Sequence, residues 1–178
     1  ETIRSRCWKI NFQPLEDNAL LSILIEEFEI ESSIAKEVVS FSGGSTQTAI
    51  SLIENNFEDL LDKTIKILRY SFGKKYHSAL LEFEEMLSES DVTRIKLVIT
   101  MIIIWLNDYQ KYRFIEGGRF YFLKQIETLE KFNSKFPDAD VSEVANKLDH
   151  ISSTFRNNIN LNIAVSNIIF QLSKLTYS

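Results

Sequence analysis

Residues 97–106 read LVITMIIIWL, and this stretch decides the fold that the sequence predicts. It belongs to a segment in which Ile95, Val98, Ile102 and Leu106 recur at helical spacing, which predicts an α-helix. Because apolar residues cover almost the whole circumference of this helix, we expect it to lie at the centre of a helical bundle. The run of ten residues is about half of what a helix needs to cross a bilayer, so we expect no membrane contact.

The composition favours the same all-α class. Hydrophobic residues make up 44% of the 178-residue chain and charged residues 25%, which is typical of a folded globular protein. Only five Gly and two Pro interrupt a chain rich in Leu, Ile, Glu and Lys, and this scarcity of helix breakers favours helices. The net charge of −5 argues against direct binding of duplex DNA, which needs Lys and Arg to neutralise phosphates.

The cysteine and histidine counts exclude two kinds of stabilising site. A single cysteine, Cys7, allows no internal disulfide, and with two histidines it cannot form a zinc cluster of the usual spacing. We therefore expect no metal and no cofactor. The chain shows no signal peptide, and a reducing, cytoplasmic location fits best.

The acidic pairs Asp59/Asp62 and Glu84-Glu85 are expected to be solvated helix faces.

Three short helices are predicted upstream of the central segment. Residues 17–28 form the first, Ser32 or Ser33 caps the second, Gly43-Gly44 ends it, and Ser45 caps the third. The pair Asn55-Asn56 marks the expected hinge to a larger bundle. Its helices are predicted over residues 57–72, 75–87, 91–106, 120–132, 141–155 and 161–175, the third capped by Asp91. A short strand is expected over residues 8–12.

The segment Ser5-Arg6-Cys7, followed by Phe12-x-Pro14-Leu15, resembles the clamp-loader branch of the AAA+ ATPases. The resemblance implies that Arg6, flanked by Ser5 and Cys7, reaches in trans toward the ATP of a neighbouring subunit. Arginine suits this role because its planar, permanently charged fork binds phosphate oxygens in two places. The resemblance also implies that residues 1–15 are the remnant of a nucleotide-binding domain, so we expect the chain to be the C-terminal part of a longer subunit.

Residues 16–56 resemble the AAA+ lid, a small three-helix domain that closes over a nucleotide. The third lid helix of ATP-hydrolysing clamp-loader subunits opens Gly-Ser-x-Arg-x-Ala, and its sensor 2 arginine contacts the γ-phosphate. The matching stretch here is GSTQTA at residues 44–49, with Gln47 at the arginine position. A neutral amide cannot supply the positive charge that phosphoryl transfer requires. The resemblance therefore implies a non-catalytic subunit with no catalytic residue of its own.

Residues 57–178 resemble the collar of the same family, a five- to six-helix bundle through which subunits associate into a ring. The match rests on Asn157, Asn160 and Leu161, a polar turn that leads into the last amphipathic helix. The implied partners are the other loader subunits, gamma/tau and delta, and indirectly the sliding clamp and primed DNA. Two alternatives remain open: an ATP-hydrolysing gamma/tau-like subunit, or an unrelated helical interaction module.

Overall fold

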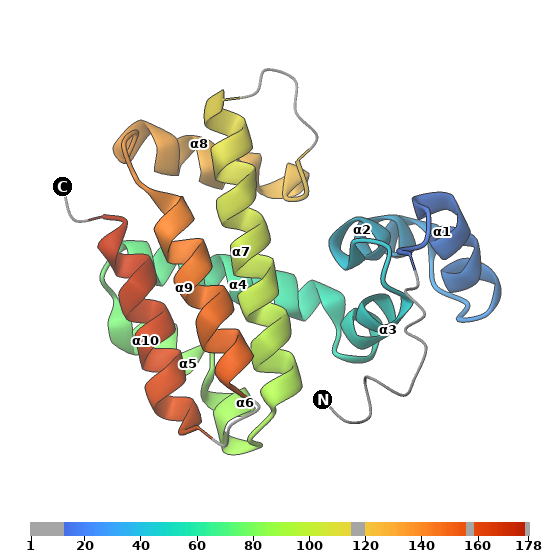
Figure 1. Cartoon of the computed structure of the whole chain (residues 1–178), viewed down its shortest axis with the longest axis horizontal. Coiled ribbons are helices and arrows are strands. Elements are labelled where there is room, and N and C mark those ends of the chain that lie inside the picture. The colour runs from blue at the N-terminus through green and yellow to red at the C-terminus, as the bar shows by residue number, and fades with distance from the viewer. Residues whose placement is uncertain (1–12, 115–119, 156–158, 177–178) are drawn as a thin grey trace, which may run out of the picture. The chain divides into compact units, whose positions relative to one another are not determined.

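The computed structural model describes residues 13–114, 120–155 and 159–176 (Figure 1). These residues contain α-helices and one short 3-10 helix but no strand, which confirms the all-α class. The strand predicted over residues 8–12 lies outside them. The chain separates into two compact units, Glu1–Ser51 and Leu52–Ser178. The division falls inside the third helix, shortly before Asn55-Asn56.

The first unit is built from α1 (Asp17–Glu26), α2 (Ser32–Ser42) and most of α3 (Thr46–Glu54). Leu20 and Leu24 of α1 are fully buried, as are Ala35 and Val38 of α2, because α1 and α2 pack against each other. These pairs lie three or four residues apart, the spacing that places side chains on one face of a helix. The buried face that the sequence predicted for both helices is therefore present.

The end of α1 differs from the prediction, which extended the helix to Phe28. The helix stops at Glu26, and the N–H of Ile30 donates to the carbonyl of Leu24 at 3.1 Å. Glu29 adopts a left-handed conformation, φ 53°, which turns the chain away from the helix axis. Phe28 is consequently 42% exposed instead of buried.

The predicted end of α2 and the predicted cap of α3 are confirmed, whereas the predicted cap at the start of α2 is not. Gly43, with φ 58°, ends α2 in the left-handed conformation that glycine tolerates best. Ser45 caps α3, because its Oγ accepts the Thr48 N–H at 3.2 Å. The predicted serine cap of α2 is wrong: Glu31 occupies the cap position, and Ser33 donates its hydroxyl to the Glu31 carboxylate at 2.7 Å.

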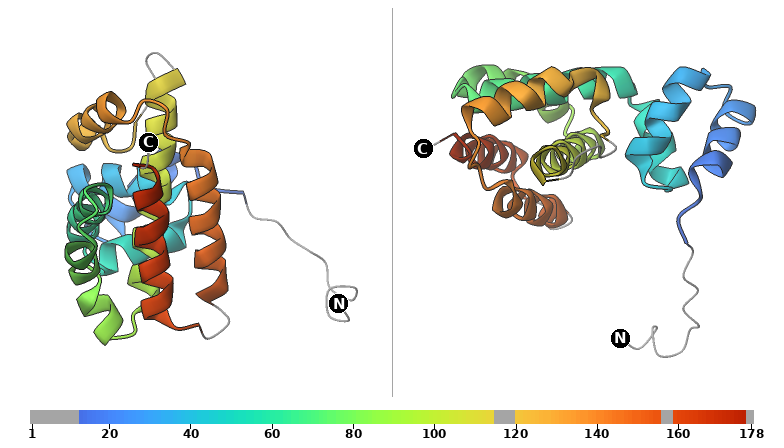
Figure 2. Two further views of the ribbon diagram at one scale, coloured as in Figure 1. Left: turned by 90° about the vertical axis from the view of Figure 1, so that its left-hand side faces the viewer. Right: turned by 90° about the horizontal axis from the view of Figure 1, so that it is seen from above.

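The second unit contains the remaining described elements. They are α4 (Phe57–Phe72), α5 (Tyr76–Leu81), α6 (Glu84–Ser88), α7 (Val92–Phe114), η2 (Leu123–Gln125), α8 (Ile126–Lys135), α9 (Val141–Thr154) and α10 (Leu161–Lys174). Helices α7, α9 and α10 run alongside one another, with α4, α5 and α8 across one side of them (Figure 2).

The central position of α7 is confirmed, since it packs against α4, α6, α8 and α9. Asp91 caps it by accepting the Arg94 N–H at 2.9 Å, as predicted. Trp105, fully buried in the middle of α7, lies 5.4 Å from both Phe72 of α4 and Phe132 of α8, measured between ring centroids. Aromatic pairs at these separations add to the stability that burial provides.

Two helices of this unit are shorter than predicted. The helix expected over residues 75–87 is broken into α5 and α6, where the Phe83 N–H donates to Leu80 only three residues back, at 3.0 Å. Phe83, at this tighter turn, is fully buried, as predicted. Tyr76 was also predicted to face inward, but it is 39% exposed. The helix expected from Phe120 begins only at Ile126, after η2.

The late start of α8 is explained by Asp108 of α7, a carboxylate with no exposed surface. Its Oδ2 accepts the N–H groups of Tyr121 at 2.7 Å and of Phe122 at 3.0 Å. Its Oδ1 lies 3.5 Å from the Lys111 ammonium. Since these backbone groups are bonded to a side chain of α7, residues 121–122 are held as a connector against α7.

Limited proteolysis is expected to release a resistant fragment that begins near Phe57. The second unit buries its side chains around α7, whereas the small first unit buries less surface and is expected to open more readily. N-terminal sequencing and mass spectrometry of the fragment provide the test. A resistant core that always retains residues 17–54 would contradict the prediction.

Candidate interaction surface

Of the residues that the sequence marked as functional, the structure describes Gln47, Asn160 and Leu161. Ser5, Arg6, Cys7 and Asn157 lie outside the described residues. Gln47 lies in the first turn of α3, in the first unit, with its side chain exposed. The described residues contain no group of three His, Cys, Asp or Glu side chains placed to hold a metal ion. Within the same residues no helix has the length and apolar character to cross a membrane.

The collar motif has a definite structural role at the start of α10. Asn160 is the N-cap of this helix, and its Oδ1 accepts the Ile163 N–H at 3.3 Å. Leu161 is the first helical residue and is half-buried. The cap therefore fixes where α10 begins.

The outward face of α10 has an unusual composition for an exposed helix. Ile163 is 68% exposed and Phe170, two turns later, is 49% exposed. Between them lie the exposed uncharged residues Ser166 and Asn167. Lys174 is the single charged residue of the fourteen in α10, and its ammonium lies 4.7 Å from the centroid of the Phe170 ring. Exposed apolar surface with little charge is typical of protein contact sites.

A shallow groove continues this face toward α5 and α6, since α10 packs against α5. One hollow of about 450 Å³ is lined by Leu80, Leu81, Leu87 and Asn162 together with polar residues. A second hollow, of about 200 Å³, adjoins it through Leu80 and is lined by Tyr76, Leu80, Ser166, Ile169 and Phe170. Leu81 at the edge is 50% exposed. The groove and the outer face of α10 together form what we call the α5–α10 surface.

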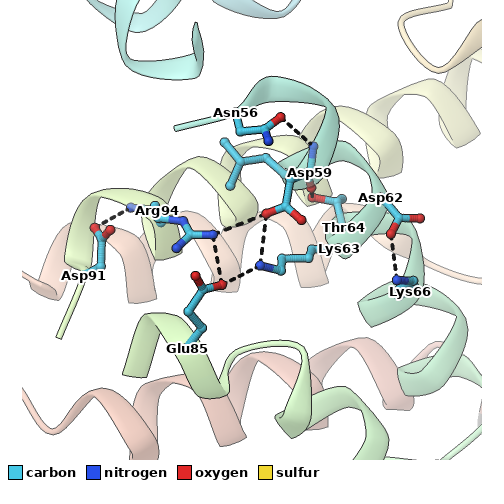
Figure 3. A network of polar contacts seen from close by, with 10 residues as sticks. Asn56, Asp59, Asp62, Lys63, Thr64, Lys66, Glu85, Asp91 and Arg94 are labelled. Carbon is cyan, nitrogen blue, oxygen red and sulfur yellow. Dashed lines mark hydrogen bonds and ion pairs between the residues drawn. The ribbon is translucent and has the colours of Figure 1, made fainter. Parts of the chain in front are cut away.

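An ion-pair network holds α6, one wall of this surface, against the neighbouring helices (Figure 3). The Glu85 carboxylate of α6 lies 2.8 Å from the Lys63 ammonium of α4 and 3.2 Å from the Arg94 guanidinium of α7. Asp59 of α4 pairs with the same two cations at 3.0 and 3.3 Å. The side chains of Asp59 and Glu85 are partly exposed, as predicted for solvated helix faces. Both also belong to this ion-pair network, which the sequence did not indicate.

This network changes the ionisation of its members. Hydrogen bonds from Lys63 and then from Arg94 lower the pKa of Glu85 to about 2. A lowered carboxyl pKa contributes stability that is present above the ordinary pKa of 4.5 and is lost as the pH falls toward 2. The groove wall formed by α6 is therefore held by charges that stay paired throughout the neutral range.

The residues of the α5–α10 surface were not identified from the sequence. The periodicity of α10 pointed to its buried stripe, which includes Val165, Ile168 and Leu172. Two signals in the sequence could have revealed the outer face. Ile163 and Phe170 are seven residues apart, which places them on the same side of a helix, and no charged residue precedes Lys174 in this helix.

Comparison of the chain with models of protein families, with curated proteins and with solved structures gives no match.

Proposed function

We propose that this chain is a non-catalytic subunit of a bacterial replicative clamp loader, most like the delta-prime subunit of the DNA polymerase III clamp loader. It acts in the cytoplasm, supports assembly of the loader ring, and assists ATP-driven loading of the sliding clamp onto primed DNA. The observation that carries the proposal is the order of the helices: a small unit with α1, α2 and most of α3, then a larger helical unit ending in α10. A lid followed by a collar has this order.

The proposed role of the first unit rests on Gln47. This residue follows the Gly44-Ser45 turn, in the first turn of the third helix, where hydrolysing relatives carry the sensor 2 arginine. Its side chain is exposed, so an arginine in its place would be free to reach an anion. Because glutamine has no charge, this unit cannot stabilise a transferring phosphoryl group from the lid side. In this proposal the subunit contributes to ATP hydrolysis only through Arg6, which acts at the ATP site of a neighbouring subunit.

The second unit is proposed to hold the gamma/tau and delta subunits through the α5–α10 surface. The exposed apolar residues of this surface, and the single charged residue of α10, fit a contact that excludes water. A partner helix that places apolar side chains beside Phe170 and Leu81 would cover them. This contact is also what the rival interpretation, an unrelated helical interaction module, requires, so the identity of the partner decides between the two.

Replacing Phe170 with glutamate is expected to weaken association with gamma/tau and delta by about 30-fold or more. A carboxylate enclosed in an apolar contact loses its hydration without gaining a partner, which is worth on the order of 2 kcal/mol. Since Phe170 is 49% exposed, the variant is expected to keep its helical content. Analytical ultracentrifugation measures association, and circular dichroism measures folding.

Phe114→Glu is the matched control for this experiment. Phe114 is 74% exposed at the end of α7 and does not line the groove, so its replacement introduces the same charge outside the α5–α10 surface. It is expected to assemble like the unmodified chain. Equal association of the Phe170→Glu and unmodified chains would exclude the α5–α10 surface as the contact.

A further inference from the structure

A separate hollow of about 210 Å³ lies in the second unit, between the start of α9 and the end of α10. Asp138, Asp140 and Glu143 line it before and within the first turn of α9, and Gln171 and Lys174 line it from the last turn of α10. We call it the α9–α10 hollow. It shares no lining residue with the groove beside α5, so it is a different concave feature of this unit.

Gln171 brings an unused hydrogen-bond acceptor to this hollow. Its side chain lies in the last turn of α10 and the residue is only 9% exposed. Its Nε2 donates to the Asn167 Oδ1 at 3.0 Å, one turn earlier in the same helix. Within the part of the chain that the structure describes, the buried Oε1 has no hydrogen-bond partner. A ligand that brings an N–H group to this oxygen therefore gains a hydrogen bond without replacing one in the protein.

The charges around the hollow favour a cation. Asp138 and Asp140 are exposed, and neither forms an ion pair with another described residue. The two lysines of the hollow are already engaged, since Lys147 pairs with Glu143 and the Lys174 ammonium lies over an aromatic ring of α10. The C-terminal end of a helix also attracts positive charge, and α10 ends at Lys174.

A guanidinium group fits this hollow better than a metal ion does. No three His, Cys, Asp or Glu side chains among the described residues are placed to hold a metal ion. A guanidinium spreads its N–H donors over a plane, so it can reach Gln171 Oε1 and a carboxylate at the same time. Val144 and Leu175, 5% and 8% exposed, give the hollow an apolar wall against which the methylene groups of an arginine can pack.

We infer that the α9–α10 hollow binds the guanidinium group of an arginine side chain from the partner that covers the outer face of α10. Gln171 Oε1 accepts one of its N–H groups, and Asp138 and Asp140 balance its charge. Lys174 connects the two features, because it lines the hollow and its ammonium lies 4.7 Å from the centroid of the Phe170 ring. The identity of the partner rests on the proposed function, whereas the chemistry of the hollow does not.

The first arm of the test needs no partner. N-acetyl-arginine methylamide is titrated into the isotope-labelled chain, and NMR follows the Gln171 side-chain amide and the methyl groups of Val144 and Leu175. Saturable shifts are expected, with a dissociation constant on the order of millimolar. N-acetyl-citrulline methylamide has a similar shape without the charge and is expected to bind about fivefold more weakly or less. Equal responses to both compounds, including no response, or a response to inorganic phosphate alone would overturn the inference.

Three variants locate the binding within the chain. Gln171→Met keeps the side-chain length, removes the unpartnered oxygen, and is expected to weaken binding of the arginine compound about tenfold. Asp140→Asn removes a charge but can still cap α9, and is expected to weaken binding about threefold. Asp149→Asn, at an exposed position of α9 outside the hollow, is the control and is expected to bind normally. Unchanged binding in both Gln171→Met and Asp140→Asn would overturn the inference.

The second arm tests the occupant in the complex with gamma/tau and delta, by analytical ultracentrifugation. Asp140→Asn is expected to weaken association about threefold, whereas Asp149→Asn is expected to leave it unchanged. A loss of association in Phe170→Glu with none in Asp140→Asn or Gln171→Met would overturn the arginine contact and leave the proposed function in place. If the unmodified chain does not associate with these subunits, the proposed function fails, and the first arm alone decides whether the hollow binds a guanidinium group.

Discussion

Replacing Arg6 with alanine is expected to lower ATP turnover about 10³–10⁵-fold at the one site that the proposed function assigns to this residue. Total hydrolysis by the reconstituted loader then falls only in part, because the other sites take their arginines from other subunits. Folding and ring assembly are expected to remain nearly intact, since the proposed assembly contact is the α5–α10 surface. Steady-state ATPase assays on the loader, with assembly checked by gel filtration, provide the measurement.

Two further substitutions make this test specific for the chemistry of Arg6. Arg6→Lys is expected to be defective as well, because an ammonium is a point charge and cannot bind two phosphate oxygens in the fixed geometry of a guanidinium. Arg4→Ala removes the same charge two residues away and is expected to leave turnover unchanged. Wild-type turnover at every site in the Arg6→Ala loader would show that Ser5-Arg6-Cys7 has another role.

Replacing Asp108 with alanine is expected to destabilise the second unit by about 4 kcal/mol. The change leaves the N–H groups of Tyr121 and Phe122 without the oxygen that binds both of them, and unsatisfied buried donors cost about 1–3 kcal/mol each. A loss of this size lowers the melting temperature by roughly 10–20 °C. Urea unfolding followed by circular dichroism gives the free energy directly. An unchanged midpoint would show that Asp108 does not anchor the chain before α8.

Asp108→Asn separates the hydrogen bonds from the charge. Its amide oxygen can still accept both N–H groups, so the expected loss is much smaller than that of alanine. The two chains should also differ in their response to pH. Burial raises the pKa of Asp108 above its ordinary 3.8, against the opposing effect of its bonds to Phe122 and Tyr121 and of Lys111.

The sign of this pH effect follows from the raised pKa. The stability that the protonated Asp108 contributes is fully present below pH 3.8 and is lost as the pH rises through the higher pKa of the folded state. Asparagine does not titrate, so this decline is expected to be absent from the variant. Unfolding free energies measured across the acidic range test it, and identical pH profiles of the two chains would contradict it.

Features encoded by neighbouring residues were predictable from the sequence. The apolar circumference of α7, the left-handed Gly43 and the caps at Ser45 and Asp91 each depend on residues within one or two turns. Features that depend on distant partners were not. The delayed start of α8 requires the Asp108 carboxylate, which is thirteen residues from Tyr121 in the chain.

The candidate surface shows the same limit. Asn160 was marked by its sequence context, and it does cap α10. The groove beside that helix exists only because α10 packs against α5, and the break between α5 and α6 gives its wall a shape that periodicity alone does not indicate. The pairing of Glu85 with Lys63, twenty-two residues away in the chain, likewise depends on tertiary structure.

The mass of the complex formed with gamma/tau and delta subunits tests the central claim most directly. Native mass spectrometry of an equimolar mixture is expected to show one assembly containing all three components, and the Phe170→Glu chain should be missing from it while the Phe114→Glu chain is retained. If the unmodified chain stays outside an otherwise complete gamma/tau–delta assembly, it is not a subunit of this clamp loader.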